Sequence, residues 1–590
     1  MKGRQPSHNL SGLTSSMMKS RRRFVQGLAG GGILSAGLAS SSFVFGNPAT
    51  STVRRPEELR GRVFNLFIDE TIVNFTGSEH RATAINGSIP GPTLRWKEGE
   101  EVTINVTNRL KERTSLHWHG MILPFNMDGV PGISFPGIAP GETFQYRFKV
   151  QQSGTYWYHS HSAFQEMTGM YGAIIIEPAS VEHIQADQDH VIMLSEWTDE
   201  DPFYVFQKLK TMGHLYNFNQ PTLPGLIRDI AERGLGAAVS KRDMFNSMRM
   251  KPTDLADLSA ETLTYLVNGI TPAGNDTSLF EKGQRVRLRI INAAGNTFFD
   301  VRIPDLPMTV VQVDGMNVEP VTVDELRLGA GETYDVVVTP TEDAYTIFAE
   351  TMDRTGFARG TLATRPGLTA PVPERRTAQW LSMADMMGNM SGGDHDMAGM
   401  NHGSDDNGDM QMSMGNSVRS RHATSEFGPS TDMRVDFPRT NLDDPGVGLR
   451  GASHRVLALA DLRSLHGPFD DREPDREIEL HLTGNMERYS WSIDGLEYGN
   501  STPIHFRHGE RLRVHLHNDT MMTHPMHLHG MWSDIEDENG NFLVRRHTVP
   551  VQPAQRVSFS VTADALGRWV WHCHLLFHMD AGMFREVVVV

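Results

Sequence analysis

Five residues near the carboxyl terminus have side chains that bind soft metals: His572, Cys573, His574, His578 and Met583. Cys573 is the only cysteine in the chain, so it cannot form an internal disulfide. A thiolate that is followed five residues later by an imidazole and ten residues later by a thioether matches the ligand set of a blue-copper site. The spacing therefore predicts one copper ion at Cys573, His578 and Met583.

The residues before Cys573 predict where its two histidine neighbours point. Residues 569–571 (Trp-Val-Trp) have the composition of a β-strand. Successive side chains of a strand point to opposite faces, so Cys573 should face one way and His572 and His574 the other. One copper would lie at the sulfur and others at the imidazoles. Only a few covalent bonds would separate them, which is a short path for electrons.

Three further histidine clusters could complete a second copper centre. They are His117-Trp118-His119, His159-Ser160-His161 and His524-Pro525-Met526-His527-Leu528-His529. A His-x-His pair on a strand places both imidazoles on one face, and imidazole suits copper. Together with His572 and His574, eight histidines are available, while Pro525 bends the chain so that His524 can join Cys573 instead. A single such pair is more often a surface or core feature, but four clusters around the only cysteine favour copper.

These histidine and cysteine clusters lie in three segments, and their types and order resemble those of the multicopper oxidases. The segments are 117–161, 524–529 and 572–583. The resemblance implies four copper ions, and each expected ligand has a counterpart in this chain. The implied type 1 ligands are His524, Cys573, His578 and Met583, the type 2 ligands are His117 and His527, and the type 3 ligands are His119, His159, His161, His529, His572 and His574.

The resemblance also implies a reaction, in which four one-electron oxidations of a reducing substrate are coupled to reduction of dioxygen to water. Electrons would enter at an exposed edge of His524 or His578 and pass through Cys573 to the histidine cluster. Forming water also consumes protons. Asp128 follows the first histidine pair in a loop rich in Gly and Pro, and related enzymes have an acid near this position, so we expect it to donate them. The alternative is a turn residue that caps its own backbone, and Asp580 is a second candidate.

An internal repeat predicts the elements that position these residues. Residues 99–108, 283–292 and 509–518 are similar strands, and each follows an Asn-Gly or Asp-Gly turn. Their alternating apolar residues indicate strands with one buried face. We therefore expect an all-β chain of three β-sandwich domains, which are cupredoxin domains in the family that the chain resembles. The expected domains are 51–182, 183–370 and 431–590, with the three-copper cluster at the interface of the first and third.

Two segments depart from the β pattern. Residues 200–262 contain apolar runs typical of short helices inserted in the middle domain. A linker at 371–430 contains a Met-rich insertion, 381–416, in which Met and His lie among Gly, Asp, Asn and Ser. We expect this insertion to be disordered, because it lacks apolar partners for a core. Thioethers select Cu(I), so it would bind additional copper; the alternative is an inert linker.

Composition and the amino terminus indicate export. The chain is acidic, with 55 Lys and Arg against 71 Asp and Glu, which argues against a nucleic-acid partner. Residues 1–50 are the exception. The sequence Ser-Arg-Arg-Arg-Phe-Val at 20–25 resembles a twin-arginine signal, and the apolar run after it is too short and too rich in Gly and Ser to span a membrane. We expect the twin-arginine machinery to export a periplasmic protein without a membrane span. The alternative is a basic tail beside an apolar patch.

The substrate is predicted from the residues around His524 and from the Met-rich insertion. Asp519, Met521 and Met522 precede His524, where a reducing metal ion could dock, although both methionines could equally pack inside the domain. Together with the signal, these features resemble the periplasmic copper-resistance oxidases. The resemblance implies oxidation of Cu(I) to Cu(II), with a possible copper partner in the periplasm or outer membrane. The alternatives are a laccase-like phenol oxidase and a copper-sequestering protein with little turnover. A copper nitrite reductase would be smaller and would lack the paired histidines.

Overall fold

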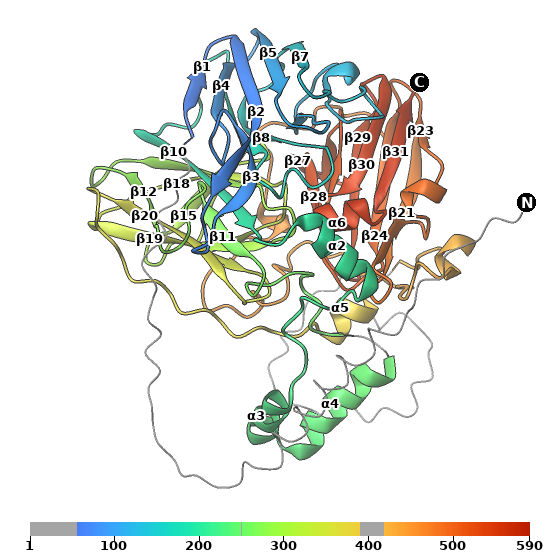
Figure 1. The fold of residues 1–590 in the computed structure, drawn as a ribbon. Helices are drawn as coiled ribbons and strands as arrows, with labels where there is room; N and C mark the ends of the chain where they lie inside the picture. The colour runs from blue at the N-terminus through green and yellow to red at the C-terminus, as the bar shows by residue number, and fades with distance from the viewer. Residues whose placement is uncertain (1–55, 249–250, 390–417) are drawn as a thin grey trace, which may run out of the picture. The chain divides into compact units, whose positions relative to one another are not determined.

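The computed structural model describes residues 56–248, 251–389 and 418–590. The predicted signal, 1–50, and most of the Met-rich insertion lie outside these residues. The described chain forms six β-sheets and few helices, so the expected all-β class is confirmed. The sheets follow one another along the chain in three pairs, which are coloured blue, green to yellow and orange to red in Figure 1.

The first pair of sheets carries two of the histidine clusters. Its five-stranded sheet has the order β1-β4-β9-β8-β6, and its four-stranded sheet has the order β3-β2-β5-β7. The strands are β1 (Glu58–Arg60), β2 (Val63–Val73), β3 (His80–Ile85), β4 (Thr93–Lys97), β5 (Glu101–Asn108), β6 (His117–His119), β7 (Thr143–Lys149), β8 (Gly154–His159) and β9 (Tyr171–Glu177).

The second pair contains no predicted ligand. Its sheets have the orders β11-β10-β13-β18-β15-β16 and β12-β20-β19-β14-β17. The strands are β10 (Gln188–Trp197), β11 (Thr264–Val267), β12 (Asp276–Leu279), β13 (Val286–Asn292), β14 (Phe299–Arg302), β15 (Met308–Val313), β16 (Met316–Val323), β17 (Glu325–Leu328), β18 (Thr333–Val338), β19 (Ala344–Thr351) and β20 (Phe357–Ala363).

The third pair carries the carboxyl-terminal clusters. Its sheets have the orders β22-β21-β24-β29-β26-β27 and β23-β31-β30-β25-β28. The strands are β21 (Arg476–Asn485), β22 (Ser490–Ile493), β23 (Ile504–Phe506), β24 (Arg511–Asn518), β25 (His524–Leu528), β26 (Ser533–Glu536), β27 (Phe542–Arg546), β28 (Thr548–Val551), β29 (Arg556–Thr562), β30 (Gly567–Cys573) and β31 (Phe584–Val589).

The predicted repeat strands occupy equivalent places in the three pairs. β5, β13 and β24 each pair in parallel with the preceding long strand, β2, β10 or β21, and antiparallel with β7, β18 or β29. The turn before each repeat strand is also the same. Asn86, Asn268 and Asp494 have φ values of 55°, 51° and 56°, and the glycine after each also has positive φ. Asn, Asp and Gly tolerate this left-handed backbone, which explains the recurring dipeptide.

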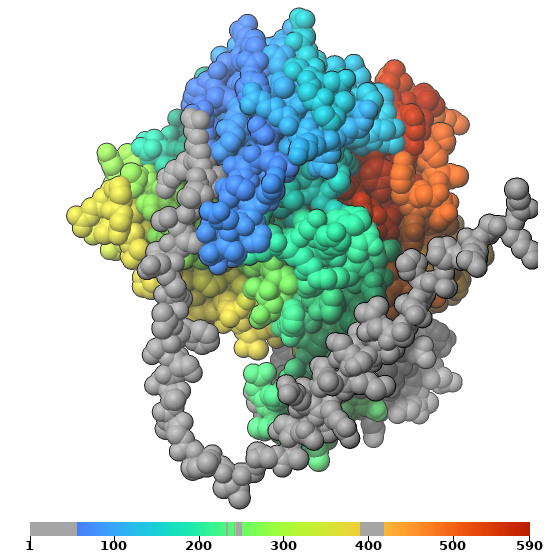
Figure 2. Space-filling model, viewed as in Figure 1, coloured from blue at the N-terminus to red at the C-terminus, as the bar shows by residue number. Residues whose placement is uncertain are grey.

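Helices lie mainly in the predicted insertion of the middle segment. They are α2 (Pro202–Thr211), α3 (Leu223–Arg233), α4 (Leu235–Met248), α5 (Met383–Met387) and α6 (Leu576–Asp580), with 3₁₀ turns η1 (Phe125–Met127), η3 (Thr424–Phe427), η4 (Leu459–Asp461) and η5 (Tyr498–Asn500). Asp201 caps α2 by accepting a hydrogen bond from the Phe203 N–H, and Pro202 occupies its first turn. On the inner face of α2, Phe206 contacts Phe577 of α6 with ring centroids 5.9 Å apart. Helix α2 thus packs against α6, beside which it lies in Figure 1, and Figure 2 shows this green segment at the surface beside the red residues.

The start of the Met-rich insertion differs from the expectation of disorder. Residues 381–389 are described, and they include α5, which Ser382 caps in a capping box with Asp385. Met386 is fully buried in the apolar cluster that contains Met433 and Val435. The carboxylate of Asp385 accepts hydrogen bonds from Arg450. The apolar partners of this segment come from elsewhere in the sequence, which is why its local composition did not predict folding.

The three pairs of sheets do not each have a separate apolar core. One continuous cluster of buried residues runs through the second and third pairs, whereas the first pair has a separate cluster around Trp96 and Trp118. Among the described residues, no helix has the length and apolar character that crossing a membrane requires.

Candidate metal centre

A sulfur and two imidazoles meet where β25, β30 and α6 come together. His524 begins β25, Cys573 ends the neighbouring strand β30, and His578 lies in α6. Cys573 Sγ is 3.5 Å from His524 Nδ1 and 3.8 Å from His578 Nδ1, and the two nitrogens are 3.1 Å apart. Met583 is buried, and its carbonyl accepts a hydrogen bond of 3.1 Å from the Cys573 N–H. These four residues are called the type 1 group below.

The chemistry of the type 1 group fits copper. Burial raises the pKa of the Cys573 thiol well above its usual range and lowers the pKa of His524 well below it. The sulfur therefore becomes a thiolate only with a cation beside it, whereas the imidazole is already in its neutral, ligating form. One soft sulfur and two imidazole nitrogens, with a thioether residue adjacent, form a set that copper prefers.

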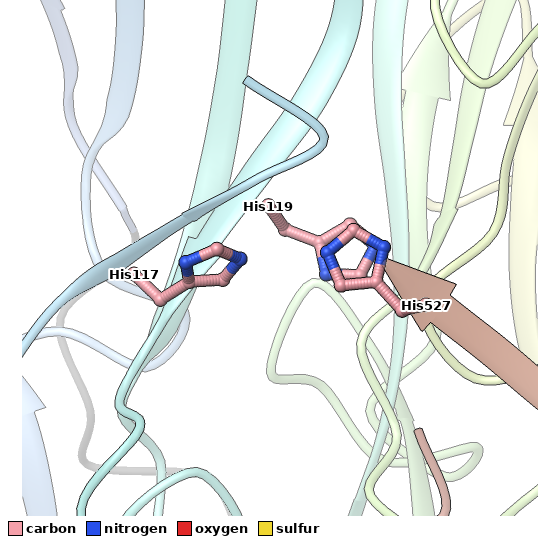
Figure 3. Close-up of side chains that lie close together, drawn as sticks. All are labelled: His117, His119 and His527. Carbon is pink, nitrogen blue, oxygen red and sulfur yellow. The ribbon is translucent and has the colours of Figure 1, made fainter. Parts of the chain in front are cut away.

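Eight other histidines form three groups of three, of which the first two share His119. Ligand atoms of each group lie within 4.8 Å of one another, and the groups are His117–His119–His527, His119–His159–His574 and His161–His529–His572. Antiparallel pairing explains the arrangement, since His117 lies opposite His159 on β6 and β8, and His527 lies opposite His572 on β25 and β30. Each group combines residues of the first and third pairs of sheets. Figure 3 shows the first group, in which the His119 and His527 rings stack with centroids 3.8 Å apart.

One nitrogen of most of these rings is fixed by the protein, and the other has no protein partner. His117 Nδ1, His527 Nδ1 and His572 Nδ1 lie 2.7–2.9 Å from backbone carbonyls, and His159 Nδ1 lies 2.8 Å from Glu166 Oε2. The buried nitrogens without a hydrogen-bond partner are His117 Nε2, His119 Nδ1, His159 Nε2, His161 Nε2, His527 Nε2 and both nitrogens of His574. Buried polar atoms are rarely left unpaired, so these nitrogens fit metal ligation. The opposite nitrogens of His117, His119, His159 and His527 are held in place by protein contacts.

Six histidines of these groups are held in the neutral form: His119, His161, His527, His529, His572 and His574. Burial, reinforced by the neighbouring histidines, lowers the pKa values of His119, His161, His527 and His529 well below the usual range. Burial also lowers the pKa of His572 to about 3. Neutral imidazoles can ligate copper without first losing a proton. The residues present therefore fit a cluster of copper ions.

Asp128 lies beside two of these histidines. Its Oδ2 is 2.9 Å from His529 Nδ1, and its Oδ1 is 3.3 Å from His117 Nδ1. The residue follows η1 and is 2% exposed, so bulk water does not solvate the carboxylate. The carboxylate thus contacts the histidine cluster rather than capping its own loop. Asp580, the second candidate for the proton donor, is at the exposed end of α6.

The expectation that His524 or His578 has an exposed edge is wrong. Both histidines are 0% exposed. Asp257 Oδ2 lies 2.8 Å from His578 Nε2 and accepts a hydrogen bond of 2.6 Å from the Tyr489 hydroxyl. Trp491 stacks on His578 with ring centroids 3.9 Å apart. Sequence reasoning missed Asp257, because it belongs to the helical insertion and lies in no motif with the ligands.

The residues before His524 also differ from the predicted docking site. Met521 and Met522 are 7% and 3% exposed and belong to the apolar core, so the packing alternative describes them. Asp519 is buried, and its Oδ2 lies 2.7 Å from His481 Nδ1. Thr520, which sequence reasoning missed, places its hydroxyl 2.7 Å from His524 Nε2. These four residues therefore line the interior beside the type 1 group.

Comparisons with known proteins agree with this geometry. Three family models, each described as multicopper oxidase, match residues 68–181, 188–366 and 471–590. The chain is 52% identical to Copper resistance protein A of Escherichia coli, and the match covers 97% of this chain and 99% of the relative. It is 51% identical, with the same coverage, to the Copper resistance protein A homolog of Pseudomonas syringae pv. tomato.

Solved structures share the fold at lower sequence identity. Fet3p, a multicopper oxidase that functions in iron import, has a TM-score of 0.62 at 20% identity, covering 90% of each chain. The laccase from Botrytis aclada has a TM-score of 0.61 at 21% identity, covering 91% of this chain and 88% of that one. The family models, the extent of these relatives and the shared fold lead to one conclusion: this chain belongs to the multicopper oxidase family.

Proposed function

We propose that this protein is a copper-resistance oxidase that oxidises Cu(I) to Cu(II) and reduces dioxygen to water. The observation that carries the proposal is the complete set of ligand groups on both sides of Cys573. The sulfur belongs to the type 1 group, while His572 and His574, its neighbours in sequence, belong to two of the three histidine groups. The relatives named for copper resistance match along nearly their whole length, which supports this choice among the activities of the family.

Members of this family use four copper ions, and the described residues would hold them as follows. His524, Cys573, His578 and Met583 would hold the type 1 ion, and His117 and His527 the type 2 ion. His119, His159 and His574 would hold one type 3 ion, and His161, His529 and His572 the other. Copper in these sites supplies one-electron redox steps and the four electrons that dioxygen needs.

The remaining residues around the groups orient ligands and move protons. Backbone carbonyls and Glu166 fix the ring orientation of the ligating histidines, as hydrogen-bond partners of metal ligands do. Asp128 is positioned to exchange a proton at His529 Nδ1, 2.9 Å away, and we assign it as the proton donor of the reaction. Asp257 orients His578 through its Nε2 and carries a negative charge at the edge of the type 1 group that faces the helical insertion.

The burial of the type 1 group favours Cu(I) over a bulky phenol. Trp491 and Asp257 cover His578, Tyr489 bonds to Asp257, and within the described part of the chain the His578 ring has no exposed edge. A laccase-like phenol oxidase needs an open organic pocket at this edge, and the laccase from Botrytis aclada, at 21% identity, shows the fold alone. A sequestering protein with little turnover would not require eight histidines in three groups around a buried cysteine. The Met-rich insertion is proposed to bind additional copper, and its residues 390–416 lie outside the part of the chain that the structure describes.

The cellular setting completes the proposal. Residues 1–50 would direct twin-arginine export to the periplasm, where the mature domains 51–182, 183–370 and 431–590 would act, together with the linker 371–430. Export by this route delivers folded proteins, which suits a chain whose metal groups combine distant segments. A copper-binding partner in the periplasm or outer membrane would supply or receive the metal.

Oxygen uptake by the copper-loaded protein tests the function. Cu(I) and a simple phenol are supplied in parallel to wild-type protein and to Cys573→Ser. We expect rapid uptake with Cu(I) that Cys573→Ser abolishes. Uptake with the phenol alone would establish the laccase-like activity instead, and no uptake with either reductant would leave sequestration as the function.

A further inference from the structure

Four metal-binding side chains lie together outside the copper groups. His422, Glu426, His481 and Asp519, called the 422–519 cluster here, come from three separate segments. His422 precedes η3 and Glu426 lies within it, His481 is on β21, and Asp519 follows β24 directly. The parallel pairing of β21 with β24 brings the last two segments side by side. None of these residues takes part in the function proposed above.

The four ligand atoms alternate nitrogen and oxygen around a small ring. His422 Nδ1 is 2.8 Å from Glu426 Oε2, which is 3.5 Å from His481 Nδ1. That nitrogen is 2.7 Å from Asp519 Oδ2, which is 3.6 Å from His422 Nδ1. With metal bonds of about 2.0–2.2 Å, neighbouring ligands lie about 2.9 Å apart in a square plane and about 3.4 Å apart in a tetrahedron. The observed spacings therefore suit one transition-metal ion.

The backbone holds both carboxylates so that one oxygen of each faces the ring. Glu426 Oε1 accepts a hydrogen bond of 2.9 Å from the Ala423 N–H. Asp519 Oδ1 accepts one of 3.0 Å from the Val435 N–H. Glu426 and Asp519 are each 1% exposed, and the side chain of His422 is 7% exposed, which leaves a route to solvent on that side. The cluster is thus a rigid, buried set of donors rather than a group of mobile surface acids.

The outer nitrogens of both histidines face further carboxylates. His422 Nε2 lies 3.4 Å from Asp436 Oδ1, and His481 Nε2 lies 3.6 Å from Glu479 Oε1. Both nitrogens are buried and have no hydrogen-bond partner in the geometry described. A histidine that ligates metal through one nitrogen characteristically donates the N–H of the other to a carboxylate. A carboxylate therefore lies near the outer nitrogen of each ring, as in that pattern, but at a distance longer than a hydrogen bond.

A network of salt bridges without metal is the alternative explanation. In that case each ring donates from Nδ1 to Glu426 or Asp519, and each also needs a proton on Nε2 to face Asp436 or Glu479. The two rings then carry two positive charges. One divalent ion at the Nδ1 atoms would replace two protons at the same total charge. Metal and protons therefore compete for one site, which makes the two explanations experimentally separable.

We propose that the 422–519 cluster is a further metal site, which binds one divalent transition-metal ion such as Zn²⁺ or Cu²⁺ through two imidazoles and two carboxylates. This ligand set lacks the sulfur that favours Cu(I). The site is linked to the type 1 group by a short loop, because Thr520, next to Asp519, contacts His524. Metal binding at this site does not depend on the proposed function. The further statement that Cu²⁺, the product of the proposed reaction, occupies the site in the cell rests on that function.

Zinc retention by the copper-loaded protein tests the site. Zinc is the probe, because thioethers of the Met-rich insertion do not favour it. After incubation with zinc and desalting, zinc and copper per chain are measured in wild type, His422→Gln and Glu426→Gln, with the exposed His508→Gln as matched control. We expect one zinc per chain in wild type and control, bound at least about tenfold more weakly in the other two variants. X-ray absorption should show nitrogen and oxygen neighbours and no sulfur.

Crystals soaked in zinc give a second measurement that does not depend on how well the variants fold. An anomalous peak between His422 Nδ1 and His481 Nδ1 is expected. Absence of the peak, absence of retained zinc in wild type, or equal zinc affinity in wild type and His422→Gln would each overturn the proposal in favour of the salt-bridge network. Oxygen uptake is recorded on the same samples. Retained zinc without Cu(I) oxidation would leave this site standing and would overturn only the proposed function.

Discussion

Replacing Asp257 with Asn tests how the protein tunes the type 1 group. In the structure, Asp257 Oδ2 receives two contacts, from the Tyr489 hydroxyl at 2.6 Å and from His578 Nε2 at 2.8 Å. The substitution keeps the size of the side chain and removes its charge. An amide can present its oxygen to one of these donors, but it places an N–H₂ group near the other. The negative charge beside His578 is lost in either orientation.

The expected size of the effect follows from the hydrogen bond to His578. A hydrogen bond to a charged group contributes about 1.5–3 kcal/mol and a neutral one about 0.5–1.5 kcal/mol, so the substitution removes about 1–1.5 kcal/mol. A negative charge stabilises the oxidised, more positive state of a metal group. If the whole loss falls on the oxidised state, the reduction potential rises by about 40–65 mV, at 59 mV per tenfold change for one electron.

Redox titration of the type 1 absorption in copper-loaded protein measures this shift. Asp254→Asn is a matched control, because Asp254 is equally buried at 3% exposure but bonds to Asn217. Burial raises the pKa of Asp254 to about 7, so part of its population is already uncharged at neutral pH. We expect a clearly smaller change in the control. An unchanged or lowered potential in Asp257→Asn, with copper content intact, would refute the assigned role of this carboxylate.

Three further predictions concern other parts of the molecule. Deleting 390–416 should preserve the blue colour and the stability while slowing Cu(I) oxidation. Deleting 381–416 should also lower the free energy of unfolding by about 2–5 kcal/mol, because it removes buried Met386. Urea titration compares the stability of the two deletion variants, and equal stability would contradict the packing described. Asp128→Asn should slow oxygen uptake about 100-fold or more without loss of copper, and uptake within a few-fold of wild type would exclude it as the proton donor. The pKa of His572 is about 3 in the folded protein and about 6.5 in the unfolded chain. Between about pH 3 and about pH 6.5 the unfolded chain therefore binds a proton at this histidine that the folded protein does not bind, which favours unfolding as the pH falls. The metal-free protein should therefore lose about 2 kcal/mol per such histidine on going from pH 7 to pH 5, and stability that stays constant over this range would show that these rings are not buried neutral.

Sequence spacing was sufficient to predict which residues meet at the copper groups. Strand alternation separates Cys573 from His572 and His574, and the structure places all three in different groups. The Asn-Gly and Asp-Gly turns likewise predicted three equivalent sandwiches, because few residues other than Asn, Asp and Gly tolerate the left-handed backbone. These successes share one property: the signal lies within a few residues of the feature that it predicts.

The features that sequence reasoning missed depend on contacts between distant segments. Asp257 reaches His578 from the helical insertion, and no local pattern marks it as a ligand partner. Met386 seemed to lack apolar neighbours, yet it packs against a core assembled from residues further along the chain. Asp519 was expected at a docking site beside His524, but it points to His481, because parallel pairing of β21 and β24 brings that ring alongside. Burial and tertiary pairing decide such cases.

Each of the three histidine groups combines residues from 117–161 with residues from 527–574, and this has a consequence for biosynthesis. His117 and His159 are made early, but their partners His527 and His572 appear only as translation nears its end. A chain that ends before residue 527 therefore contains part of every group and completes none. Tight copper retention therefore indicates that synthesis of the chain is complete and that the first and last sandwiches have docked.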